Sequence, residues 1–232
     1  MAETKTVSPK TESTVTVDRT RDFWDRYNKV IIYAGLGILL IVVGYIAYKN
    51  FVLEPNEKKA SEQIYRAEEY FRADSLTLAL NGDGINPGFL KIIDKYGSTK
   101  SGNLAKYYAG VIYLQMGNYG NAIKYLNDFD TDAQQIQARA YKLLGDAYAE
   151  QGKNSDALSH YKMAGHHFEK DDVNSPEYLF LAGYFAETVM NDKKQAIELY
   201  KEVKENYPQS ERGFEIDNWS WKFEAGDRGP RE

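Results

Sequence analysis

The feature that most restricts the fold of this chain is a residue pattern that occurs twice, with an offset of 35 residues. The first copy begins near Lys106 and the second near Tyr141. A period of about 20 to 50 residues is typical of proteins that stack one supersecondary unit on the next. Matching small and aromatic residues define the pattern, namely Gly110 with Gly145, Tyr113 with Tyr148, Gly117 with Gly152 and Ala122 with Ala157.

Each copy reads as two antiparallel helices joined by a short turn. Gly110 and Ala122 are small where the two helices of a hairpin must approach each other, and Tyr113 is large enough to fill the space between successive hairpins. Gly117 ends the first helix, because glycine adopts the left-handed conformation of such a turn without steric cost. The pattern resembles the tetratricopeptide repeat, a helical hairpin of about 34 residues. The resemblance implies an all-α solenoid.

Two further units extend the predicted array. One begins at Ser175, where Pro176 stands in the first turn of a helix, and it runs to Pro208. Its first helix is out of register by one residue, which predicts an insertion before Lys193. The array then has about three to four hairpins, enough to share a continuous core. The other unit is degenerate, with one helical segment over residues 58–80, a loop over 81–88 and a return helix over 89–96.

Residues 30–48 contain no charged residue and are almost all apolar. As a helix they span roughly 28 Å, close to the ~30 Å hydrocarbon core of a bilayer. We therefore predict a single transmembrane helix at residues 29–49. A cleaved signal peptide is the alternative, but its apolar region is only about 7 to 15 residues long and Tyr45 stands where a small residue would be needed. A buried core helix is disfavoured because the segment has no polar face.

Basic residues are slightly more numerous before the predicted span than after it, which favours a cytoplasmic N-terminus and a translocated C-terminal domain. Arg19, Arg21, Arg26 and Lys29 precede the span, and Lys49, Lys58 and Lys59 follow it. The predicted organisation is a mostly disordered cytoplasmic tail at residues 1–28, the span, a linker at 50–59, a repeat domain at 60–217 and a C-terminal tail at 218–232.

Gly37 and Gly44 lie on one face of the predicted span. Small residues let another membrane helix approach closely, so we predict that this face docks against a membrane partner. The alternative is that these glycines only reflect the general frequency of glycine in membrane helices. In the C-terminal tail, Trp219, Trp221 and Phe223 alternate like a short strand or pack as a cap on the last helix.

The sequence shows no pattern that predicts catalysis or metal binding. With no cysteine, the chain has no disulfide, thiolate ligand or cysteine nucleophile. His166 and His167 lie six and seven residues after His160, whereas metal ligands on one helix are usually about three or four apart. The loop at residues 81–84 lacks the alternating carboxylates of a calcium loop. We therefore expect no enzyme activity, no metal and no cofactor, and the net charge of −5 argues against nucleic acid as a partner.

The function that the repeats do predict is polypeptide binding. The tetratricopeptide resemblance implies that the first helix of each hairpin lines a concave face. That face would be apolar at both ends and charged in the middle, which suits unfolded or extended polypeptides. The alternative for each single residue is that it packs against a neighbouring repeat. The predicted groove residues are Leu104, Tyr107, Val111 and Leu114, then Arg139 and Lys142 with Asp146 and Ala149, then Leu181 and Phe185 with Tyr178.

Tetratricopeptide co-chaperones that bind a C-terminal carboxylate use lysines and asparagines on these inner helices. This chain has Tyr107, Val111 and Leu143 at the corresponding places, so that activity is not carried over.

The N-terminal anchor followed by acidic repeats resembles the YfgM-like family of ancillary subunits of the bacterial SecYEG translocon, over about residues 20–210. The segments 196–200 and 205–208 belong to the shared repeat pattern. The resemblance implies an inner-membrane protein whose periplasmic repeats bind emerging secreted chains and pass them to periplasmic chaperones. Two alternatives remain: a scaffold for envelope assembly or cell division that binds one folded partner, and an import receptor whose repeats face the cytosol.

Overall fold

The computed structural model describes residues 12–218, and the chain divides into two compact units between Pro55 and Asn56. The first unit consists of α1 (Glu12–Tyr48) and a short π-helix, η1 (Lys49–Leu53). From Arg26 onward, the described residues contain one continuous helical stretch that is long and apolar enough to cross a membrane. Its most apolar window has no buried residue, so its apolar side chains are free to face lipid.

Helix extends beyond the predicted span on both sides. The predicted disordered tail is helical from Glu12, and the predicted linker at 50–59 is helical as well. The physical reason is that extending an existing helix adds one hydrogen bond per residue without a new nucleation step. A stable apolar helix therefore continues into its polar flanks. Residues 1–11 of the predicted tail and residues 219–232 of the C-terminal tail lie outside the described residues.

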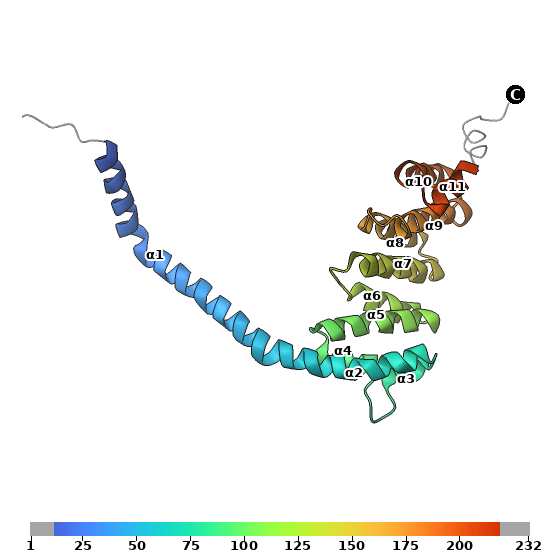
Figure 1. Cartoon of the computed structure of the whole chain (residues 1–232), viewed down its shortest axis with the longest axis horizontal. Helices are drawn as coiled ribbons and strands as arrows, with labels where there is room; N and C mark the ends of the chain where they lie inside the picture. Colours follow the sequence, from blue (N-terminus) through green and yellow to red (C-terminus); the bar gives the residue numbers. More distant parts are fainter. Residues whose placement is uncertain (1–11, 219–232) are drawn as a thin grey trace, which may run out of the picture. The chain divides into compact units, whose positions relative to one another are not determined.

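The second unit is a series of helices that pack against their neighbours in chain order, from α4 to α11 (Figure 1). Residues 56–218 contain no β-strand, only one isolated bridge between Gly82 and Pro87. The prediction of an all-α chain, with an apolar N-terminal helix followed by helical repeats, is confirmed. The helices are α2 (Glu54–Arg72), α3 (Leu76–Asn81), α4 (Phe89–Tyr96), α5 (Lys100–Gln115), α6 (Tyr119–Asn127), α7 (Gln134–Glu150), α8 (Asn154–His167), α9 (Asn174–Thr188), α10 (Lys193–Asn206) and α11 (Glu211–Asn218).

Three hairpins, α5–α6, α7–α8 and α9–α10, share one contact between a glycine and a large side chain. A Cβ atom on Gly110 would lie 2.5 Å from Leu126, and one on Gly145 would lie 2.5 Å from Tyr161. A Cβ atom on Gly183 would lie 2.7 Å from Tyr200 in the third hairpin. The predicted close approach of helices at Gly110 and Gly145 is therefore confirmed.

The third hairpin contains the predicted extra residue. The large side chain follows the glycine by 16 residues in the first two hairpins (126 − 110 and 161 − 145) and by 17 residues in the third (200 − 183). In the turns, Gly117 and Gly152 have φ angles of +73° and +70°, and Asn191 takes this left-handed position in the third turn with φ of +55°. Asparagine tolerates that conformation better than most residues. The extra residue lies between the end of α9 and Asn191, before Lys193 as predicted.

The degenerate first unit is only partly as predicted. The loop after Asn81 and the return helix α4 are confirmed, but the single helix expected over residues 58–80 is broken into α2 and α3. Asp74 has a φ angle of +56° between them, a conformation that a right-handed helix does not accommodate. The apolar core of this unit is continuous with α5 and contains Ile64, Ala67, Ala79, Leu80, Phe89, Ile92, Ala105, Ala109 and Ile112.

Candidate functional site

The predicted groove residues lie on α5, α7 and α9, the first helices of the three hairpins, and α5 packs directly on α7. Arg139 is exposed to solvent, and nine others are half-buried, so each has surface that a ligand can contact. The half-buried residues are Leu104, Tyr107, Val111, Leu114, Lys142, Asp146, Ala149, Tyr178 and Leu181.

Phe185 does not belong to the predicted groove. Only 8% of its surface is exposed, and its ring packs edge-on against Tyr161 with centroids 5.4 Å apart. The reason is the position of α9, which packs against α8 as well as against α10 and α11. A helix with neighbours on several sides leaves a narrow free face, and Phe185 lies outside it.

Tyr107, Arg139 and Tyr178 lie on α5, α7 and α9, the first helices of three successive hairpins. Burial raises the pKa of Tyr107, and the positive charge of Arg139 opposes that increase. Burial likewise raises the pKa of Tyr178, Arg139 again opposes it, and Tyr107 adds to the increase. Tyr107 and Tyr178 are 71 positions apart in the chain (178 − 107), and the charge of Arg139 acts on the pKa of both. Both phenols therefore stay protonated near neutral pH.

The tyrosine from α5 is held in a fixed position by aromatic contacts. The ring centroid of Tyr107 lies 5.3 Å from that of Phe129 and 5.9 Å from that of Tyr108. Tyr108 in turn stacks on Phe89 at 4.9 Å, which connects this part of the face to the first hydrophobic core. A rigid aromatic side chain loses little conformational entropy when a ligand binds.

Ion pairs and hydrogen bonds occupy two carboxylates on α7 and α9. Lys142 Nζ lies 2.8 Å from Asp146 Oδ2, and the Tyr161 hydroxyl donates to Asp146 Oδ1 at 3.1 Å. Arg212 on α11 donates to both oxygens of Glu177, at 2.7 and 2.8 Å. The sequence predicts charged residues in the middle of this face. Most of these charges are paired with other side chains of the protein.

The pair between Glu177 and Arg212 is the site feature that the sequence analysis missed. The two residues are 35 positions apart, which is the repeat period, so they occupy equivalent places on α9 and α11. The guanidinium of Arg212 also lies 4.4 Å from the ring centroid of Phe180. The 35-residue repeat period could have predicted this pair. However, α11 lacks the pattern of glycine and tyrosine that defines the other repeats.

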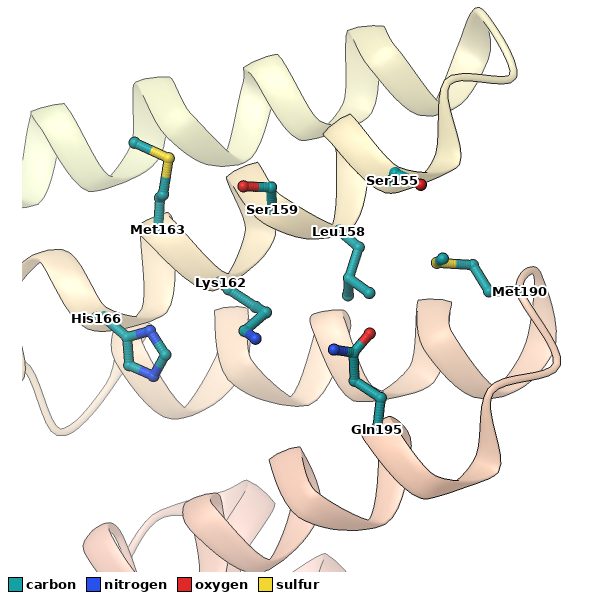
Figure 2. Close-up of a pocket in the computed structure, with 8 residues that line it drawn as sticks. All are labelled: Ser155, Leu158, Ser159, Lys162, Met163, His166, Met190 and Gln195. Carbon is teal, nitrogen blue, oxygen red and sulfur yellow. The ribbon is translucent and has the colours of Figure 1, made fainter.

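A separate cavity of about 500 Å³ is lined by α8, the α9–α10 turn and the start of α10 rather than by the predicted face. Figure 2 shows Leu158 and Gln195 pointing toward one another across it. At its edge, His166 Nε2 lies 2.6 Å from Glu202 Oε1. Among the described residues, no group of three or more His, Asp or Glu side chains is placed to hold a metal ion. The lining residues are Ser155, Leu158, Ser159, Lys162, Met163, His166, Met190 and Gln195.

The tetratricopeptide repeat family model matches residues 104–131 and 177–210, which cover most of hairpins α5–α6 and α9–α10. The chain is similar to tetratricopeptide proteins over these two hairpins. The middle hairpin, α7–α8, has the same contact between glycine and a large side chain, at Gly145 and Tyr161. A search of curated proteins gives no match. Tetratricopeptide repeats are protein interaction modules, so the chain carries a module of that kind.

Proposed function

We propose that this protein is a membrane-anchored tetratricopeptide protein that binds extended or unfolded polypeptide segments on the face formed by α5, α7 and α9. The observation that carries the proposal is that α5, α7 and α9, the first helices of three successive hairpins, keep Tyr107, Arg139 and Tyr178 partly exposed. Half-buried Leu104, Val111 and Leu181 on the same helices provide apolar contact area around them. The face thus offers both apolar surface and hydrogen-bond donors to an extended chain.

The proposal extends to location and partners. The apolar helix anchors the protein in the bacterial inner membrane, with the N-terminus in the cytoplasm and the repeats in the periplasm. There the repeats bind secreted chains as they leave the SecYEG translocon and transfer them to periplasmic chaperones. Anchoring beside the translocon raises the effective concentration of emerging segments toward the millimolar range, so weak binding is sufficient.

The proposed contact with a membrane partner is the helix face that carries Gly37 and Gly44. A Cβ atom built on either glycine meets no other atom within 4 Å, so a second helix has room to approach. Protease digestion of cells with only the outer membrane opened tests the orientation. Degradation of the repeats under that condition supports the periplasmic location, whereas protection until full lysis would replace it with a cytosolic receptor.

Replacing Leu40 and Ile41 together with arginine is expected to release the protein from the membrane fraction. Each arginine at the centre of a spanning helix costs about 3 kcal/mol for insertion. The measurement is the distribution of the full chain between pellet and supernatant after an alkaline wash. The control exchanges the same two side chains, Leu40→Ile and Ile41→Leu, and should remain in the pellet. Retention of the arginine variant in the pellet would contradict the anchor.

Site-specific photo-crosslinking tests the binding face. A photo-reactive residue in place of Val111 is expected to crosslink a permanently unfolded, carboxymethylated model protein. The same residue in place of Met163 is expected to give at least about fivefold less product, because Met163 lies on the second helix of its hairpin although 42% of its surface is exposed. Equal yields at both positions would refute a binding site confined to α5, α7 and α9. Crosslinks to one folded partner alone would favour a scaffold.

A further inference from the structure

We propose that the cavity lined by α8, the α9–α10 turn and α10 is a second binding site, and that it takes an extended segment of a partner protein. The segment that fits has an aliphatic residue and an acidic residue two positions apart. The aliphatic side chain contacts Leu158 and Met190, and the carboxylate binds Lys162. The inference goes beyond the proposed function, because it uses the second helices of the hairpins instead of the first.

The first argument is the arrangement of the lining residues along α8. Leu158, Lys162 and His166 follow one another at intervals of four residues, so they share one side of the helix. Figure 2 shows all three pointing toward the helix that carries Gln195, while Met190 points into the same space from the α9–α10 turn. The cavity is therefore apolar near Leu158 and Met190 and basic near Lys162.

The second argument is that the positive charge of Lys162 is available to a ligand. Within residues 12–218, no carboxylate forms an ion pair with Lys162, and none of the described residues that line the cavity is acidic. Glu202 at the edge of the cavity is already engaged, since its Oε1 lies 2.6 Å from His166 Nε2. Lys162 is half-buried, and a carboxylate interacts with such a group more strongly than with a fully solvated one. The chemistry that complements the cavity is thus one carboxylate beside an apolar group.

The third argument is a match of spacing. Lys162 lies about 6 Å from Leu158 along the axis of α8, because each helical residue adds about 1.5 Å. In an extended chain, side chains two positions apart point to the same side and lie roughly 6.6 Å apart. An aliphatic and an acidic residue separated by one residue, in either order, therefore place one side chain at Leu158 and the other at Lys162.

The size of the cavity favours an extended segment over a helical one. The row from Leu158 to His166 is roughly 12 Å long. A helix about 10 Å wide would fill roughly 900 Å³ over that length, nearly twice the volume of the cavity, which is about 500 Å³. Ser155, Ser159 and Gln195 line the same cavity and can form hydrogen bonds with the free backbone groups of an extended chain.

Met163 also lines the cavity, but its side chain points away from Lys162 (Figure 2). A photo-reactive residue at position 163 is therefore directed away from a segment that is bound to Lys162. Little crosslinking is expected at that position whether or not the cavity is occupied.

The test measures the binding of labelled peptides to the full-length protein in nanodiscs of neutral lipid, by fluorescence anisotropy. Each peptide has about ten residues and blocked ends, which is enough to span the cavity when extended, and serine, threonine and glycine surround its central motif. Two peptides carry leucine, serine and glutamate in that order or in reverse. A third has leucine directly next to glutamate, and a fourth replaces glutamate by glutamine in the first motif. We expect the tighter of the first two peptides to bind at least about fivefold more tightly than the third and the fourth.

A lysine variant assigns the preference for glutamate to the cavity. In Lys162→Gln, the glutamate and glutamine peptides should bind equally, because the charge that distinguishes them is gone. The matched control is Lys91→Gln, which removes an exposed lysine from α4 and should keep the full preference. Lys162→Gln should also leave crosslinking of the unfolded model protein at Val111 unchanged. The comparison of peptides on the wild-type protein needs no variant and decides the proposal even if Lys162→Gln folds poorly.

Four other outcomes are informative. If none of the peptides binds, or if the peptide with adjacent leucine and glutamate binds as tightly as the other two, the proposed site is overturned. Equal binding of the glutamate and glutamine peptides to the wild-type protein overturns the contact with Lys162. If only a helix-forming, alanine-rich peptide with leucine and glutamate four positions apart binds, the extended form is overturned. Absence of crosslinking at Val111 while the peptides still bind would overturn the proposed function and support this site as a separate one.

Discussion

Replacing Gly145 by alanine is expected to destabilise the repeat unit by about 2 kcal/mol, because the new methyl group overlaps a ring that cannot move away. The Cβ atom would lie 2.5 Å from both Cδ1 and Cε1 of Tyr161. That ring is only 4% exposed, its edge contacts Phe185, and its hydroxyl binds Asp146. Overpacking of this kind costs about 1 to 3 kcal/mol or more, and the better helix propensity of alanine offsets up to about 1 kcal/mol.

Gly120→Ala is the matched control, because Gly120 is also helical but a Cβ atom there meets nothing within 4 Å. This variant should gain up to about 1 kcal/mol in the free energy of unfolding. The measurement is urea unfolding of the full chain in detergent micelles, followed by tyrosine fluorescence. A lower free energy of unfolding for Gly145→Ala and a higher one for Gly120→Ala would support the close approach of α7 and α8. If Gly145→Ala were more stable than wild type, the Tyr161 ring would be able to move aside, and the contact would not require glycine at position 145.

The hairpins were predictable from sequence because their defining contact is short in sequence. Gly110 contacts Leu126 in one hairpin, and Gly145 contacts Tyr161 in the next. Because both residues of each pair belong to the same hairpin, their spacing repeats along the sequence. The insertion in the third hairpin was visible for the same reason. Helix boundaries were less predictable, since the break at Asp74 depends on one left-handed residue that no local pattern marks.

Exposure on the proposed binding face was predictable for the helices but not for each residue. Tyr107 and Arg139 on the first helices keep exposed surface, whereas Phe185 is buried because α8, α10 and α11 surround α9. The pairing of Glu177 with Arg212 depends on α11, whose sequence lacks the repeat pattern. Contacts between successive hairpins join residues that are further apart in the sequence. When one of the two hairpins lacks the repeat pattern, the sequence does not predict such a contact.

Above pH 10, the protein is expected to lose stability steeply, because Tyr161 and Tyr200 are buried as neutral phenols. Burial raises the pKa of both groups well above the ordinary tyrosine value, with carboxylate neighbours Asp146 and Glu187 adding to the effect. Their hydroxyls donate to those carboxylates at 3.1 and 3.0 Å. Only 4% and 3% of these residues are exposed, so water does little to stabilise a phenolate in the folded state.

The direction of the pH effect follows from proton linkage. Below pH 10 both tyrosines are protonated in the folded and unfolded states, so the stabilisation is fully present. As the pH rises past the ordinary tyrosine pKa of about 10, only the unfolded chain releases these protons, and each tyrosine then costs about 1.4 kcal/mol per pH unit. Two tyrosines together remove nearly 3 kcal/mol by about pH 11, a large part of a typical free energy of unfolding of about 5 to 15 kcal/mol.

Urea unfolding of the full chain in micelles, repeated from neutral pH to above pH 11, measures this loss. In the double variant Tyr161→Phe with Tyr200→Phe, the loss with pH should be much shallower, although stability at neutral pH falls by about 1 kcal/mol for each lost hydrogen bond. Tyr184→Phe is the matched control, because Tyr184 is 52% exposed on α9, and it should retain the wild-type slope. A double variant with an unchanged slope would mean that other groups cause the alkaline unfolding. In that case Tyr161 and Tyr200 would have to reach water more easily than their packing in the two hairpins implies.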